Sequence, residues 1–413
     1  MKFQGRMNSS LRTIAAMLLV SATALAVAPG EAGAASIVTV GDIFSANGIS
    51  PHGALTAYNG ALYGTTLTGG ANGDGTIYSF NPSTSAITDL INFSGSNGNS
   101  AQSGMTLVNG VFYGTTNTGG VNNVGEVYAF NPSTSTIANI GNFSYSNGWF
   151  PIGGLGSNGG TTLYGTTSKS QSGGGELFST STVTNTTTVV ASLGTGTASY
   201  LSSRPVFIGG VLYGTGDNGG AYGDGAIFSY NTSTNTAKTI FSFNGSNGAY
   251  PFGGMTNVGG VLYGVTQGGV VYSYDTNTSA FSLLATMPSN LGNSINATPL
   301  YENGVLYIVA SGGGSSNDGA VIAYNLATNT FTNIADFNGG NGGNPQAGLV
   351  DYNGTLYGTT SAGISGVLNS SGTVYTISGL QIQTQSVPEP SGLAVMLLSL
   401  LALGAITLRR KSA

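Results

Sequence analysis

The sequence contains no cysteine and only one histidine among its 413 residues. The lack of cysteine excludes disulfides, thiolate metal sites and a cysteine nucleophile. Because His52 is alone, a metal centre built from several histidines is excluded as well. Stability must therefore come from a large packed core, which a chain of this length can form.

Charged side chains are also scarce, at 6% of the chain. Between Ala35 and Ser386, three lysines and arginines stand against twelve aspartates and glutamates. Proteins that bind nucleic acid or an anionic membrane surface need a cationic face that displaces counterions. The sequence therefore disfavours both partners, and it indicates no cofactor.

Glycine, by contrast, occurs 69 times, and 40% of the residues are apolar. Disordered chains lack apolar residues in this proportion. We therefore expect ordered β structure, with Tyr, Phe, Val and Ile in the core.

Seven variants of a Leu-Tyr-Gly motif recur along the chain. Successive tyrosines are 50, 51, 49, 50, 44 and 50 residues apart, and such self-similarity is typical of repeat architectures. Six residues are missing between two strands of the fifth repeat, which accounts for the spacing of 44. The seven tyrosines are Tyr63, Tyr113, Tyr164, Tyr213, Tyr263, Tyr307 and Tyr357.

Each repeat reads as four short strands joined by turns. The first turn is Asn59-Gly60, and Asn-Gly or Gly-Gly recurs there in all seven repeats, at Gly159-Gly160 in the third. Both central residues of a type I′ turn need positive φ, so these pairs predict tight hairpins. In the first repeat the expected strands are residues 54–58, 61–66, 76–80 and 85–91.

Small sheets of this kind need cover on both faces, and radial stacking as blades provides it. The predicted fold is all-β, a seven-bladed β-propeller of four-stranded blades over residues 35–380. Gly64 and its equivalents would let neighbouring blades approach closely. The seventh repeat lacks a fourth strand, whereas an extra strand-like segment, residues 37–44, precedes the first repeat. We therefore expect the N-terminal strand to complete the last blade.

Several segments resemble a known family of repeats. Residues 51–55 and 62–66, followed by Gly73-Asp74-Gly75-Thr76, resemble the GloVer-type tandem repeat of exported bacterial proteins. Residues 274–278 and 324–328 are also similar to kelch repeats. The resemblance covers roughly residues 36–379 and implies a propeller, but it implies no reaction.

The N-terminal residues 1–34 have the layout of a secretory signal peptide. A basic region and an apolar run precede Ala32-Gly33-Ala34, and we expect cleavage after Ala34. The alternative is an uncleaved anchor, for which the apolar run is short. The layout predicts export across the inner membrane.

The C-terminal residues 381–413 have the layout of a second targeting signal. A linker, residues 381–390, ends in Val387, Pro388, Glu389 and Pro390. The apolar run 391–408 predicts a transmembrane helix, and Arg409, Arg410 and Lys411 place the tail 409–413 in the cytoplasm. This order resembles the PEP-CTERM sorting signal, which implies processing by an exosortase and a final place at the cell surface or outside the cell. The alternative is an ordinary tail anchor.

Candidate catalytic residues are few. Paired carboxylates can hydrolyse glycosides, but those near the loops recur with the repeat instead of forming one pair. His52 flanks a turn, where a structural or exposed histidine is commoner than a catalytic one. Asp74 and Asp224 are weak Ca²⁺ candidates, although an Asp-Gly turn explains them more simply. The loop carboxylates are Asp74, Glu126, Glu176, Asp217, Asp224 and Asp318.

Alternating strand directions divide the connections between two faces. The tight turns share one face, named the turn face, and the longer connections share the other, named the loop face. Aromatic side chains on the loop face could stack on sugar rings or anchor a partner protein. The alternative is that they fill the seams between blades. The candidate ligand residues are Trp149, Phe150, Tyr200, Tyr250, Asp74 and Asp224, with Tyr145 and Tyr222 on the same face.

Together these features predict an exported, non-catalytic propeller that binds polysaccharide or another surface protein. Two alternatives remain open. One is a secreted polysaccharide-degrading enzyme that uses the loop carboxylates, and the other is a purely structural matrix protein.

Overall fold

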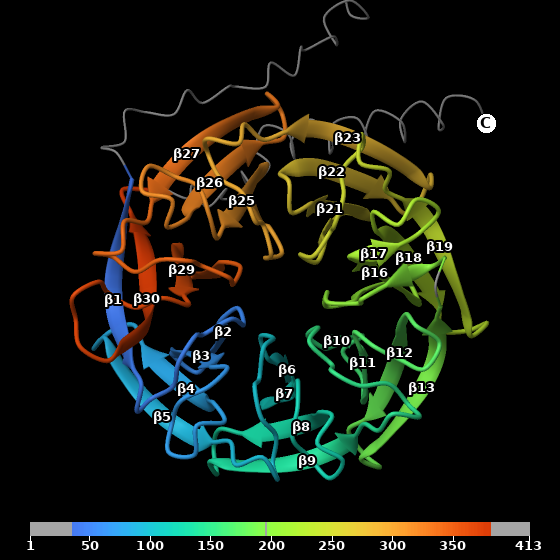
Figure 1. Ribbon diagram of the computed structural model, residues 1–413, viewed down its shortest axis with the longest axis horizontal. Coiled ribbons are helices and arrows are strands. Elements are labelled where there is room, and N and C mark those ends of the chain that lie inside the picture. The colour runs from blue at the N-terminus through green and yellow to red at the C-terminus, as the bar shows by residue number, and fades with distance from the viewer. Residues whose placement is uncertain (1–34, 195, 381–413) are drawn as a thin grey trace, which may run out of the picture. The chain divides into compact units, whose positions relative to one another are not determined.

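The computed structural model describes residues 35–194 and 196–380. These residues form seven four-stranded antiparallel sheets and a two-stranded pairing of β14 (Ala198–Ser199) with β17 (Asn218–Gly219). Figure 1 shows the sheets as blades around a central axis. No helix in the described ranges is long and apolar enough to cross a membrane. The predicted all-β, seven-bladed propeller is confirmed.

Several predicted features lie outside the described residues. They are the signal peptide with Ala32 and Ala34, the sorting motif at 387–390, the helix at 391–408 and the basic tail from Arg409 to Lys411, and they stay predictions.

Each blade runs from an inner strand near the axis to an outer strand at the rim (Figure 1). In this order the blades consist of β2 (Thr56–Tyr58), β3 (Ala61–Thr65), β4 (Thr76–Asn81) and β5 (Ala86–Asn92); β6 (Thr106–Val108), β7 (Val111–Thr116), β8 (Glu126–Asn131) and β9 (Thr136–Asn142); β10 (Gly156–Ser157), β11 (Thr162–Thr166), β12 (Gly175–Ser181) and β13 (Thr186–Leu193); β15 (Val206–Ile208), β16 (Val211–Gly216), β18 (Ala226–Asn231) and β19 (Thr236–Ser242); β20 (Thr256–Val258), β21 (Val261–Val265), β22 (Val270–Asp275) and β23 (Ala280–Thr286); β24 (Leu300–Glu302), β25 (Val305–Ala310), β26 (Ala320–Asn325) and β27 (Thr330–Asp336); and β28 (Val350–Tyr352), β29 (Thr355–Thr360), β30 (Ser370–Ser378) and β1 (Ser36–Phe44).

The N-terminal strand closes the ring, as predicted. β1 pairs antiparallel with β30, from Ser36 opposite Ser378 to Phe44 opposite Ser370. In Figure 1 the blue β1 is the outer strand of the red last blade. The two ends of the propeller are thus joined within one sheet.

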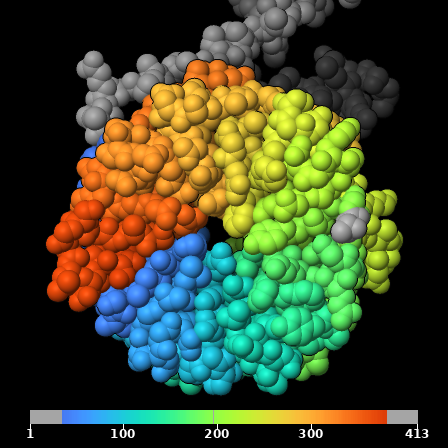
Figure 2. Space-filling model, viewed as in Figure 1, coloured from blue at the N-terminus to red at the C-terminus, as the bar shows by residue number. Residues whose placement is uncertain are grey.

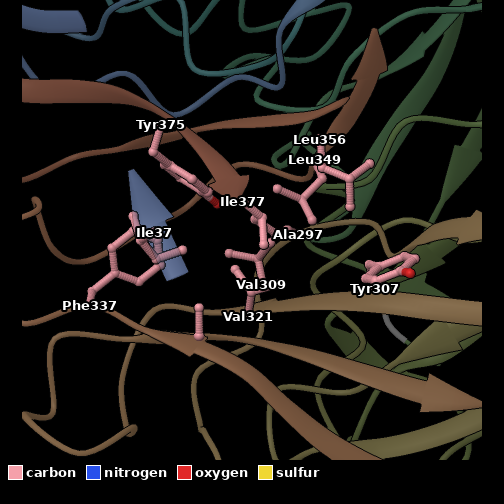
Figure 3. Packing of buried hydrophobic residues seen from close by; sticks show 11 residues of the cluster. Ile37, Ala297, Tyr307, Val309, Val321, Phe337, Leu349, Leu356, Tyr375 and Ile377 are labelled. Atoms are coloured by element: carbon pink, nitrogen blue, oxygen red, sulfur yellow. The ribbon is translucent and has the colours of Figure 1, made fainter. Parts of the chain in front are cut away.

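A hydrophobic cluster secures this closing blade against its neighbour (Figure 3). Ile37 of β1 and Tyr375 of β30 contact residues of the sixth blade, and the rings of Tyr375 and Phe337 meet edge to face with centroids 4.9 Å apart. Val309 and Val321 complete the sixth blade's side of the contact. Closure therefore depends on packing as well as on the β1–β30 hydrogen bonds.

The glycine of the repeated motif acts within a blade and not between blades. A Cβ atom at Gly64 would lie 2.5 Å from the ring of Tyr78, its cross-strand partner on β4. Five other blades repeat this pairing with Tyr or Phe, whereas the sixth pairs Ile308 with Ile322. The prediction for Gly64 is therefore wrong, because the space above the glycine is filled by an aromatic ring of the same sheet.

The tyrosine of the motif does join blades. The ring of Tyr63 lies 4.6 Å from that of Phe112 in the second blade, and the ring of Tyr164 stacks on Phe207 of the fourth at 6.2 Å. Tyr357 reaches Phe80 across the closure, at 6.1 Å. The repeated tyrosine thus packs into the seams between blades.

Six of the seven hairpin turns have both central residues at positive φ, as predicted. In the third blade Gly159 has a φ of 82°, but Gly160 is not in the positive region. The connection from Ser157 to Thr162 there is one residue longer, which accounts for the spacing of 51. The type I′ prediction is wrong for this turn.

The inner strand of the first blade also begins later than predicted, at Thr56. The chain before it, at Gly53, lies against the backbone of Ser103 and Gly104 in the next blade and not along β3.

Candidate functional site

On the loop face, one residue at the same position of each blade adopts positive φ, and in five of the seven blades its N–H group donates to the preceding blade. The N–H group of Tyr250 donates to the carbonyl of Asp224 in the preceding blade at 2.8 Å, and its own carbonyl accepts from the N–H of Gln267 at 3.0 Å. Bridges such as Ile49 to Thr68 hold the two kinds of loop side by side, which confirms the predicted loop face. The seven linking residues are Ser50, Ser100, Phe150, Tyr200, Tyr250, Ser294 and Asn344.

Two positions further along the chain, the seven blades converge on a central channel. Its end on the loop face is a cavity of about 520 Å³. Figure 2 shows a narrow opening near the centre of the ring. We call this end the channel mouth, and its seven equivalent lining residues are His52, Gln102, Ile152, Ser202, Phe252, Asn296 and Gln346.

Side-chain amides form a continuous hydrogen-bonded row on one side of the channel mouth. Gln267 Nε2 donates to Asn296 Oδ1 at 3.1 Å, and Asn296 Nδ2 donates to Gln346 Oε1 at 2.9 Å. Gln346 in turn donates to Asn344 Oδ1 at 2.7 Å. Each amide keeps a second N–H and a second lone pair, so the row offers both donors and acceptors.

His52 adds no positive charge to this row. Burial lowers the pKa of His52 to about 4, so the imidazole is neutral at pH 7. A neutral imidazole has one donor and one acceptor nitrogen, like an amide.

Three consecutive blades carry an aromatic residue two positions before their lining residue. Phe150, Tyr200 and Tyr250 are the linking residues of three consecutive blades, with φ of 57°, 53° and 57°. We call them the aromatic arc. Tyr200 is 38% exposed and Tyr250 45% exposed, whereas Lys169 lies over the half-buried Phe150, with Nζ 5.5 Å from the ring centroid. Two aromatic rings of the arc therefore face solvent.

The other predicted aromatic residues divide between the two interpretations. Tyr145 and Tyr222 are 62% and 67% exposed, so they fill no seam. Trp149 packs against the core between the second and third blades and meets Tyr145 edge to face at 5.2 Å. Trp149 is the one that fills a seam.

The backbone carbonyls of Asp74 and Asp224 accept hydrogen bonds from residues of the following blade. The carbonyl of Asp74 accepts from Ser100, as that of Asp224 does from Tyr250, and the Asp74 carboxylate accepts from Asn99. The two residues belong to the first and fourth blades. In the described part of the chain, no three His, Cys, Asp or Glu side chains come together in a group that could hold a metal ion.

Three of the loop carboxyls, Asp217, Glu126 and Glu176, are buried. Asp217 is 5% exposed and accepts a hydrogen bond from Ser202 at 3.0 Å, beside the channel mouth. Glu126 is fully buried, with one oxygen accepting from Asn139 and Oε1 without a partner. Burial raises the pKa of Asp217 and of Glu126 to about 7, against the opposing hydrogen bonds from Ser202 and Asn139.

The carboxyls of Asp217 and Glu126 should make the protein less stable as pH rises. Their folded pKa values of about 7 exceed the ordinary values of 3.8 and 4.5, so the folded state holds more protons between those limits. The free energy of unfolding then falls from pH 4 to pH 7. Asp217→Asn and Glu126→Gln should each restore about 2 to 4 kcal/mol at pH 8 and little at pH 4.

Denaturant melts across this pH range measure the effect. A matched control is Asp275→Asn, because hydrogen bonds from Asn277 hold the pKa of Asp275 below its ordinary value and other blades carry Asn at this position. Equal gains at pH 4 and pH 8 would contradict the assignment.

The sequence reasoning missed the channel mouth. His52 stands out by its residue type, whereas the other lining residues stand out only when the same position is compared between repeats. Counting 11 residues back from each motif tyrosine finds all of the lining positions except Ile152, which lies 12 back because of the longer turn in its blade.

Comparisons with known proteins agree with this architecture. The sequence model of a family described as Gloeobacter/Verrucomicrobia repeat matches residues 32–206 and 266–387. No curated protein matches the chain.

Two solved structures are similar in fold. An oligogalacturonate lyase from Vibrio parahaemolyticus is 12% identical with a TM-score of 0.53, over 83% of this chain and 96% of that one. The computationally designed Ika8 protein is 8% identical with a TM-score of 0.50, over 82% and 99%. At these identities the likeness concerns the fold alone.

Proposed function

The chain belongs to the Gloeobacter/Verrucomicrobia repeat family, whose model matches most of the propeller, and we propose that its blades form a scaffold that binds polysaccharide at the channel mouth. The observation that carries this proposal is the conformation of the aromatic arc. Bulky residues rarely adopt positive φ, because this backbone conformation lowers the folding stability by about 1–3 kcal/mol for each such residue. Four other blades place the smaller Ser or Asn at this position. Aromatic side chains held there at such a cost point to a binding role.

The chemistry of the channel mouth suits a sugar. Side-chain amides and a neutral imidazole pair with hydroxyl groups, which donate and accept at once. The ring of Phe252 in the lining supplies an apolar face, and the aromatic arc lies two positions before the lining residues of its blades. Sites of this kind combine an apolar lining with a few convergent polar groups.

Replacing the exposed aromatic rings tests the proposal. Tyr200→Asn and Tyr250→Asn install a residue that the seventh blade already has, at Asn344. We expect each variant to gain about 1 kcal/mol of stability by relieving backbone strain. We also expect each to bind the organism's own exopolysaccharide about 10-fold more weakly by calorimetry, the loss of about 1.4 kcal/mol.

Tyr222→Asn is the matched control, since Tyr222 is exposed on the same face but belongs to no linking position. Unchanged affinity in both arc variants would refute the proposal. Cleavage of the polymer by the wild-type protein would favour the enzyme alternative instead.

We also propose that the protein is exported and sorted through its C-terminus. The support is the order of Pro388-Glu389-Pro390, apolar run and basic tail in the sequence. Replacing the three residues by alanine should leave the tail uncleaved, which intact mass spectrometry of the cell-surface protein would reveal. Unchanged processing would exclude recognition of this motif by an exosortase.

A further inference from the structure

A single arginine stands in the central channel, just below the channel mouth. Two residues beyond each lining position, the fourth blade carries Arg204 where the other blades carry small residues. Arg204 lines both the cavity at the channel mouth and the cavity of about 530 Å³ on the turn face. Its side chain therefore fills space that the other blades leave open. The equivalent residues are Ala54, Gly104, Gly154, Gly254, Thr298 and Gly348.

The guanidinium group is held in place by the neighbouring blades. Nε donates to the carbonyl of Leu155 at 2.8 Å, and Nη2 donates to Thr106 Oγ1 at 2.5 Å. The aliphatic stem runs past Gly154, where an added Cβ would lie 3.4 Å from Cβ of Arg204. These contacts use two of the five N–H donors of an arginine, so three remain for a ligand.

No carboxylate of the described residues neutralises this charge. The two hydrogen bonds of Arg204 go to a carbonyl and a hydroxyl, and desolvation by the surrounding protein lowers its pKa without removing the charge. The side chain is exposed to the channel, yet protein surrounds the channel on every side. A charge walled by protein attracts a counter-ion more strongly than one on an open surface.

We propose that Arg204 binds the carboxylate of an acidic sugar whose ring lies in the channel mouth. This inference rests on the proposed function and narrows its ligand to uronate-containing polysaccharide. Two residues of chain span at most about 7 Å, so the backbone of Arg204 lies within that distance of the lining residue Ser202. Arginine is suited to this role because its planar fork matches a carboxylate with two parallel hydrogen bonds.

A pair of matched probes tests the inference by calorimetry on the full chain. One probe is a glucuronate-containing oligosaccharide, and the other is the same molecule with its carboxyl groups reduced to alcohols. We expect the wild type to bind the acidic probe at least 10-fold more tightly, with a preference that shrinks as NaCl is added. Arg204→Gln should erase this preference while leaving affinity for the reduced probe unchanged, and Arg204→Lys should keep part of it.

Other outcomes would overturn the inference in distinguishable ways. Equal affinity of the wild type for both probes would refute the role of Arg204 and leave the proposed function intact. Equal losses for both probes in Arg204→Gln, with a lowered melting temperature, would assign Arg204 a purely structural role. Binding of neither probe would reject the proposed function together with this inference. Arg204-dependent binding of a peptide carboxylate alone would replace the sugar with a protein partner.

Discussion

Deleting residues 36–44 is expected to abolish cooperative folding of the propeller. Ile43 is fully buried and Ile37 is 8% exposed, and truncating a buried isoleucine costs about 2–5 kcal/mol. Two such losses are comparable with the whole stability of a typical domain, about 5–15 kcal/mol. The deletion also leaves β30 as an open edge that invites aggregation. Thermal unfolding and gel filtration of the deleted chain would measure both effects.

A peptide of residues 35–46 provides the control for this deletion. Added to the deleted chain, it should pair with β30 by strand addition and restore a cooperative thermal transition. The same peptide carrying Ile43→Asp should fail, because it would bury a charge. A deleted chain that melts like the wild type would show that closure needs no N-terminal strand.

The glycine and aromatic pair within a blade should behave as one unit. An added Cβ at Gly264 would lie 2.3 Å from the hydroxyl of Tyr272, so Gly264→Ile should cost about 3 kcal/mol or more. Tyr272→Ile leaves a cavity and should cost about 2 to 4 kcal/mol. The double variant copies the natural Ile308 and Ile322 pair and should recover at least about 2 kcal/mol. Denaturant melts of all four proteins complete this cycle.

Tyr272→Phe is the matched control. The hydroxyl of Tyr272 is buried without a hydrogen-bond partner, and two blades carry Phe178 and Phe228 at this position. The variant should therefore be as stable as the wild type or more stable by about 1 kcal/mol. Strictly additive losses in the double isoleucine variant would mean that the two positions do not share one space.

Much of the fold follows from residues that repeat. The motif tyrosines set the number of blades, and the unmatched segment 37–44 identified the closing strand. The packing role of Gly64 could not be derived, because a glycine gives no sign of which neighbour fills the space beside it. Its cross-strand partner Tyr78 becomes evident only once the register is known.

The site was harder to predict because it depends on residues that differ from blade to blade. Tyr200 and Tyr250 were found because aromatic residues stand out in a loop, whereas Gln346 and Asn296 resemble the many polar residues around them. Arg204 is one of three cations between Ala35 and Ser386, but its place in the channel follows from the convergence of seven blades. The position of a residue in the channel therefore cannot be predicted from its type alone.

The structure of the complex with an acidic oligosaccharide is the most direct test of a ligand site at the channel mouth. We predict a sugar ring between the exposed rings of Tyr200 and Tyr250 and the amides of Asn296 and Gln346, with its carboxylate directed at Arg204. A ligand in the turn-face cavity beside Asn109 and Ser157, or on the outer rim, would contradict this account.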